Sequence, residues 1–177
     1  MSERIILFVK WSLTIFITLL PIALISGPFL SDLLVSLCVI IFIFYCFYFN
    51  NFNFFNNNFF KYFIIFYLIC LLSALFSDYK LISSIKSLFY FRFGVFAIAF
   101  CFALSINEKL IKYLFISLFF CFLILILDGY LQYFTGTNII GISKNGDRLS
   151  SFFGSEIIYG SYLVRLLPIL IALFFLT

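Results

Sequence analysis

The side chains in this sequence that are best suited to bind an anion are two arginines near its C-terminal end. Arg148 and Arg165 belong to the stretch RLSSFFGSEIIYGSYLVRLLP, and Arg165 stands inside an apolar run. A charge at the centre of a membrane helix costs roughly 2.5–3.5 kcal/mol on insertion scales, so its retention needs a reason. Arginine suits phosphate because its planar guanidinium donates two parallel hydrogen bonds. The pair therefore predicts a diphosphate site; the alternative is that Arg165 only extends its side chain to the membrane surface.

Small and acidic residues around the arginines support this interpretation. Gly154 and Gly160 carry no Cβ and would let a ligand or another backbone approach closely. Glu156 precedes Arg165 by nine residues, which on a helix puts the two on opposite sides. We therefore expect Glu156, together with Asp128, to balance the charge of the empty site rather than to pair with Arg165 inside one helix.

Further polar residues lie in the two apolar spans that precede Arg148, at about 82–104 and 112–134. Asp128 and Gln132 are four residues apart and so share one face of a helix. We expect them to brace the basic residues; the alternative is that they only cap the helix at the membrane edge. Arg92 lies about ten residues, or roughly 15 Å, into its apolar span, where it either binds the diphosphate or pairs with Asp128. Lys86 is near enough to the start of that span to reach the surface. No residue is assigned to catalysis.

The composition indicates a membrane protein. Of the 177 residues 66% are hydrophobic and only 10% are charged, against roughly 45–50% and 25% in soluble domains. The net charge of +4 is scattered without a basic stripe, which excludes nucleic-acid binding. The sequence has no histidine and no nucleotide-binding or hydrolase motif, so we expect no metal site and no cofactor. Its five cysteines fall in apolar runs and are expected to be buried and unbridged.

Apolar runs of about 20 residues, long enough to cross a bilayer, follow one another along the chain. Each must be helical, because lipid offers no partner to a free backbone group. The sequence therefore predicts an all-α polytopic membrane bundle, with a single transmembrane domain over residues 1–177. We expect six helices, at about 11–29, 32–49, 62–76, 82–104, 112–134 and 157–176.

The Lys and Arg residues in the connections predict the orientation. With the N-terminus in the cytoplasm, five of these residues lie on the cytoplasmic side and three, including Arg148, on the outer side. The loop over 144–156 then faces outward. The last apolar run reaches Thr177 without a polar flank, so we expect the chain to continue beyond it.

Residues 128–168 resemble the bacterial O-antigen ligase and O-antigen polymerase family. In that family an aspartate-tyrosine-glutamine-glycine pattern closes one helix, as DGYLQYFTGTNIIG does here. A polar loop, an arginine, small residues and a glycine-led helix follow. The corresponding positions here are Arg148, Gly154, Glu156, Gly160 and Arg165. The stretch SIKSLFYFRFGVFAIA, with Lys86 and Arg92, is also similar to an earlier helix of the family.

This resemblance implies a multi-pass enzyme of the bacterial inner membrane with part of a C-type glycosyltransferase fold. Such enzymes transfer or polymerise glycans from an undecaprenyl-diphosphate carrier on the periplasmic face, without a metal or a nucleotide sugar. Ligases use lipid A-core as the glycan acceptor, and polymerases use another carrier-linked repeat. Outward-facing arginines, here Arg148 and Arg165, would hold the diphosphate.

The chain departs from the family in one respect. The large periplasmic loop in which ligases carry a catalytic histidine would follow Thr177, so the resemblance covers only an N-terminal portion of such an enzyme. A second interpretation is a small polytopic protein without enzymatic activity. It would be a transporter or a lipid-flippase component whose intramembrane charges gate an anionic lipid.

Overall fold

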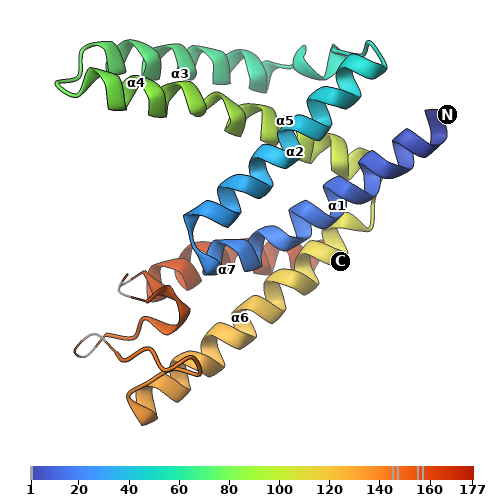
Figure 1. Ribbon diagram of the computed structural model, residues 1–177. Helices are drawn as coiled ribbons and strands as arrows, with labels where there is room; N and C mark the ends of the chain where they lie inside the picture. Colours follow the sequence, from blue (N-terminus) through green and yellow to red (C-terminus); the bar gives the residue numbers. More distant parts are fainter. Residues whose placement is uncertain (1, 145, 147, 155, 157) are drawn as a thin grey trace. The chain divides into compact units, whose positions relative to one another are not determined.

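The computed structural model describes residues 2–144, 146, 148–154, 156 and 158–177 of the chain, and this part is built from helices (Figure 1). Two short 3-10 turns, η1 (Asn53–Phe55) and η2 (Ser151–Phe153), lie in connections. An isolated antiparallel bridge pairs Thr137 with Ser143. The α-helices are α1 (Ser2–Ser26), α2 (Pro28–Tyr48), α3 (Asn58–Leu75), α4 (Lys80–Phe89), α5 (Phe91–Ile106), α6 (Leu110–Thr135) and α7 (Tyr159–Leu176).

Six helical segments of the described chain are long and apolar enough to cross a membrane, with α4 and α5 together forming one of them. This confirms the predicted all-α polytopic architecture. The helix α1 begins at Ser2 rather than near residue 11, because polar residues such as Glu3 and Arg4 also favour a helix. The helix α3 begins at Asn58, before the predicted start, since the Asn57 side chain accepts a hydrogen bond from the Phe60 amide at 2.7 Å.

One predicted span is interrupted. The run expected at 82–104 consists of α4 and α5, with Tyr90 between them. The Tyr90 amide donates to the carbonyl of Ser87 at 3.1 Å, which is the shorter repeat of a 3-10 turn rather than that of an α-helix. Neither proline nor glycine marks the break in the sequence.

The contacts within the chain form two compact units, and α1 and α2 contribute a part to each. The first unit contains residues up to Phe16, together with 35–107. In it, the rings of Phe42, Phe54 and Phe102 lie with their centroids 5.1 to 5.8 Å apart. The aromatic residues that are frequent in this sequence therefore serve, in this cluster, as core packing.

Two long-range contacts tie the first unit together. The side-chain amide of Asn107, after α5, donates to the hydroxyl of Thr14 in α1 at 2.8 Å, and both residues are buried. Gly94 in α5 lies directly against the ring of Phe63 in α3, where a Cβ atom would overlap with the ring. The absence of a side chain at Gly94 therefore sets how closely α3 and α5 approach.

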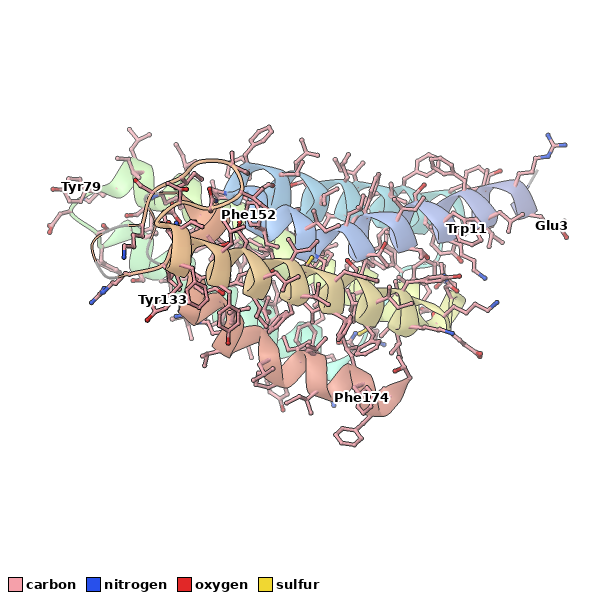
Figure 2. The ribbon with its side chains drawn as sticks, turned by 90° about the horizontal axis from the view of Figure 1, so that it is seen from below. Glu3, Trp11, Tyr79, Tyr133, Phe152 and Phe174 are labelled. Carbon is pink, nitrogen blue, oxygen red and sulfur yellow. The ribbon has the colours of Figure 1, made fainter. Side chains whose placement is uncertain are left out.

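The second unit contains residues 17–34 and the chain from Glu108 to Thr177, so its main elements are α6 and α7. These two helices run antiparallel, because Tyr159 contacts Leu125 near one end and Phe174 contacts Phe115 near the other. Figure 2 shows Phe174 far along this helix pair from Tyr133 (Figure 2).

An apolar cluster lies between these two helices. Leu118 and Phe122 of α6 and Leu173 of α7 are buried there. Side chains of α6 and α7 also donate to carbonyls of α1: the Ser117 hydroxyl to Thr18 at 2.5 Å, and the Tyr162 hydroxyl to Pro21 at 3.1 Å.

The cysteines differ in part from the expectation. All five are free thiols, as predicted, and Cys38, Cys46 and Cys121 are buried. Cys70 is half-buried and Cys101 is exposed, so the prediction that all five are buried was wrong. The physical reason is that an apolar face of a membrane helix can meet lipid instead of protein, and a thiol is tolerated at either place.

Candidate binding loop at the end of α6

The connection from α6 to α7 begins with a turn that only glycine adopts easily. Gly136 follows the last residue of α6 with φ of 83°, and its amide donates to the carbonyl of Gln132. This left-handed residue ends the helix and reverses the chain. The loop then returns along the last turns of α6 and reaches η2 (Figure 1).

Asp128 and Gln132 lie on the face of α6 that receives this loop. Both are almost completely buried, with 2% and 0% of their surface exposed. The Asp128 carboxylate accepts a hydrogen bond from the amide of Ile139 at 3.0 Å, and its other oxygen accepts one from the hydroxyl of Ser151. The Asp128 side chain therefore binds both arms of the loop at once: the first arm, which leaves α6, at Ile139, and the second arm, which leads to α7, at Ser151.

The Gln132 side chain binds the backbone of the second arm of the loop, the part that leads to α7. Its side-chain oxygen accepts from the amides of Ser150 and Ser151 at 3.0 and 2.9 Å. Its side-chain nitrogen donates to the carbonyl of Ile142 at 3.2 Å and to the hydroxyl of Ser150 at 3.3 Å. A single amide side chain thus satisfies donors and acceptors that come from both arms.

Asn138 completes this polar cluster. Its side-chain oxygen accepts from the amides of Ile140 and Ile142, which closes a tight turn, and its side-chain nitrogen donates to the carbonyl of Ser151 at 2.9 Å. We call the following residues the loop clamp: Asp128, Gln132, Asn138, Ser150 and Ser151. All five are buried.

The length of α6 explains why the loop needs the hydrogen bonds of the loop clamp. The helix α6 has 26 residues, a length of about 39 Å, which exceeds the roughly 30 Å of a bilayer core. When α6 is centred in the bilayer, Asp128 lies about 8 Å from the mid-plane, inside the hydrocarbon region. Irregular backbone at that depth is tolerated only where protein groups satisfy it. The clamp supplies those groups.

The contacts of Asp128 and Gln132 agree with their predicted placement on one helix face. We expected them on one face of a helix, and both bind Ser151 from the same face of α6. We also expected them to brace basic residues, but the partners described above are backbone and hydroxyl groups of the loop. Their effect on Arg148 is indirect: it lies two residues before Ser150, in the arm that Gln132 holds.

The other predicted residues of the loop are open to the surroundings. Arg148 and Glu156 are exposed. Gly154 has φ of 64°, a conformation that favours glycine, so its role is to turn the backbone. Gly160 lies exposed in the first turn of α7, and no atom lies within 4 Å of the position where a Cβ would stand.

Arg165 lies in the middle of α7 on an exposed face. Its approximate depth follows from the antiparallel contacts with α6, because the Tyr159 hydroxyl reaches Leu125 and the Phe174 ring reaches Phe115. Interpolation between these pairs puts the Arg165 backbone level with the middle of α6. The charge is therefore attached about half-way through the span, where exposure to lipid costs most.

Arg92 belongs to the first unit, whereas Arg148 and Arg165 belong to the second. It is half-buried, its guanidinium donates to the Ser36 hydroxyl at 3.4 Å, and it lies 5.0 Å from the centroid of the Phe93 ring. These are contacts that also stabilise an arginine in the absence of any ligand.

Sequence reasoning missed several residues that build this loop. Asn138 could have been found, because an asparagine in a polar connection is typical of turns that its own side chain closes. Ser150 and Ser151 gave no such signal. Tyr159 was missed too: its hydroxyl donates to the Leu125 carbonyl at 3.0 Å, over the space left by Gly129.

Comparison with known proteins adds no assignment. No model of a protein family matches this chain, and no curated protein or solved structure matches it.

Proposed function

We propose that this chain is the membrane portion of a glycan ligase or polymerase similar to the O-antigen enzymes, acting in the bacterial inner membrane. In this proposal the periplasmic side of the chain binds the diphosphate of an undecaprenyl-linked glycan. The glycan then passes to an acceptor, either lipid A-core or another carrier-linked repeat. The observation that carries the proposal is the loop clamp, which holds a loop bearing the exposed Arg148 against the C-terminal end of α6.

The positions of the two arginines in the second unit agree with a ligand that enters from the membrane. The Arg148 arm is held level with Gln132, and the Arg165 backbone lies about ten residues of α6 deeper, which is about 15 Å. Each arginine side chain extends about 6 Å, so both guanidinium groups can approach a common level if Arg165 points toward the surface. A diphosphate on a polyprenyl tail fits such a stepped arrangement better than a soluble anion does.

The energetics favour the same ligand class. An arginine in mid-span costs roughly 2.5–3.5 kcal/mol unless a cavity, a counter-charge or a ligand compensates it. Arg165 is exposed, so a lipid-borne diphosphate is a suitable compensating group. Hydrogen bonds to charged groups contribute roughly 1.5–3 kcal/mol each, which corresponds to a factor of about 10 to 150 in affinity.

The test is binding of undecaprenyl diphosphate to the chain reconstituted in lipid nanodiscs. We expect Arg148→Ala and Arg165→Ala each to weaken binding at least about tenfold, and Arg165→Lys to fall between wild type and Arg165→Ala because lysine loses the bidentate geometry. Arg4→Ala, at the other end of the chain, is the matched control and should bind normally. Unchanged affinity in both alanine variants would rule out the site.

A second assay separates transfer from transport. Proteoliposomes that contain the chain, a labelled undecaprenyl-diphosphate glycan and an acceptor should yield a labelled acceptor if the chain suffices for ligation or polymerisation. Movement of the labelled carrier between leaflets, without any transfer, would instead support the transporter interpretation.

A further inference from the structure

The helix α4 differs from the other helices in having two chemically distinct faces. Leu81, Ile85 and Leu88 recur at the spacing of one helix face and are exposed. Ser83 and Ser87 lie on another side, which packs toward α3. A helix with an exposed apolar face and a polar inner face is inverted relative to a water-soluble protein, and this arrangement suits contact with lipid.

A cavity of about 590 Å³ lies between α3 and α4, which run side by side in the first unit (Figure 1). Its lining includes the apolar side chains of Phe66 and Ile69, which are also exposed to the surroundings. Hydroxyl groups from both helices and their connection line its walls, together with one ammonium group. The polar lining residues are Ser73, Ser77, Ser83, Ser87, Tyr90 and Lys86.

The hydroxyl groups of the two walls meet within the cavity. The oxygens of Ser77 and Ser83 are 3.0 Å apart and share one hydrogen bond. A hydroxyl has one donor and two acceptor positions, so this pair keeps capacity for a further partner. Lys86 adds three donors and a positive charge. The described residues that line the cavity include no carboxylate; Asp78 lies outside it, in the turn between the helices.

We infer that this cavity binds the phosphate of an anionic glycerophospholipid of the surrounding bilayer. The ammonium of Lys86 and the serine hydroxyls suit a phosphate diester, and the exposed apolar side chains of Phe66 and Ile69 suit the glycerol and the first methylenes of its chains. The depth agrees: Lys86 is six residues, or about 9 Å, beyond the start of α4, and its long side chain reaches back toward the headgroup region.

This lipid site is independent of the proposed function. It lies in the first unit, whereas the loop clamp, Arg148 and Arg165 lie in the second. Failure of one proposal therefore leaves the other unaffected.

Native mass spectrometry of the delipidated chain with added phospholipid tests the site. We expect phosphatidylglycerol to be retained in preference to phosphatidylcholine with the same acyl chains. Lys86→Gln should reduce this preference about fivefold, the effect of one lysine near a phosphate. Lys86→Arg should retain it. The double substitution Ser83→Ala with Ser87→Ala should lower retention of both lipids, because it removes two hydroxyl groups that line the cavity.

The matched control is Lys109→Gln, which removes one positive charge at an exposed position outside the cavity. It should leave the lipid preference unchanged. Equal retention of the two lipids by the wild type would overturn the inference, as would an unchanged preference in Lys86→Gln. Displacement of phosphatidylglycerol by an equal concentration of soluble glycerol phosphate would also overturn it, because the cavity would then take free phosphate rather than lipid.

Discussion

Replacing Gln132 by leucine removes the centre of the loop clamp while nearly preserving side-chain volume. The wild-type side chain makes four hydrogen bonds, two from its oxygen and two from its nitrogen, and none of its surface is exposed. Leucine leaves the amides of Ser150 and Ser151 without their acceptor. A buried donor without a partner costs roughly 1–3 kcal/mol, so the two amides alone cost roughly 2–6 kcal/mol.

This cost predicts a local effect. The loop can avoid it only by opening and letting water reach the two amides. At 1.4 kcal/mol for each factor of ten, the lower bound of about 2 kcal/mol corresponds to roughly 30-fold more opening. We therefore expect hydrogen–deuterium exchange at Ser150 and Ser151 to become at least about 30-fold faster in Gln132→Leu, in nanodiscs and at fixed pH.

Two comparisons make this experiment decisive. Tyr133→Leu changes the neighbouring side chain, which is 62% exposed, and should leave exchange in the loop unchanged. Amides around Leu118 in α6 should keep their slow exchange in both variants, which shows that the effect is local opening and not unfolding. If exchange at Ser150 and Ser151 is the same in Gln132→Leu as in wild type, Gln132 does not hold the loop and the reasoning is wrong.

Four further substitutions test close contacts at glycines and the predicted orientation. Gly129→Ala should lower the free energy of unfolding by about 1–3 kcal/mol, because the new methyl group would displace the Tyr159 hydroxyl. The measurement is a lower midpoint of thermal unfolding. Gly160→Ala, which meets open space, should be neutral or stabilising. Gly94→Ala should destabilise the first unit by a similar 1–3 kcal/mol, seen as faster exchange in α5, since its methyl would meet a phenyl ring. Lys144→Cys, in a background without the native cysteines, should react with an impermeant maleimide on intact cells; labelling only after permeabilisation would contradict the predicted orientation.

The number and order of the membrane-spanning helices could be predicted because each depends on a local property. A run of about 20 apolar residues has few structural options in lipid, so composition alone fixes a helix. The break at Tyr90 could not be predicted, since no residue there disfavours a helix. Contacts with other parts of the first unit, such as that between Tyr67 and the Leu88 carbonyl, come from distant segments.

The candidate site shows the same division. The shared face of Asp128 and Gln132 follows from helix periodicity and could be predicted. Their partners could not, because Ser151 lies 23 residues from Asp128 and is brought back by the path of the loop. Sequence reasoning paired opposite charges, while the structure gives Asp128 two neutral donors. At membrane depth a free backbone amide needs a partner as much as a charge does, and no sequence pattern records which amide that is.

The division of α1 and α2 between the two units has a consequence for biosynthesis. Residues 17–34 belong with α6 and α7, yet the 73 residues of 35–107 are made in between. At about 5–20 residues per second, the ribosome takes roughly 4–15 s to cover that interval. During this time the carbonyls of Thr18 and Pro21 are already in the membrane, but the hydroxyls of Ser117 and Tyr162 that bind them have not been synthesised. The second unit can therefore assemble only late in translation, and its early segment, residues 17–34, must be sheltered meanwhile by lipid or by the insertion machinery.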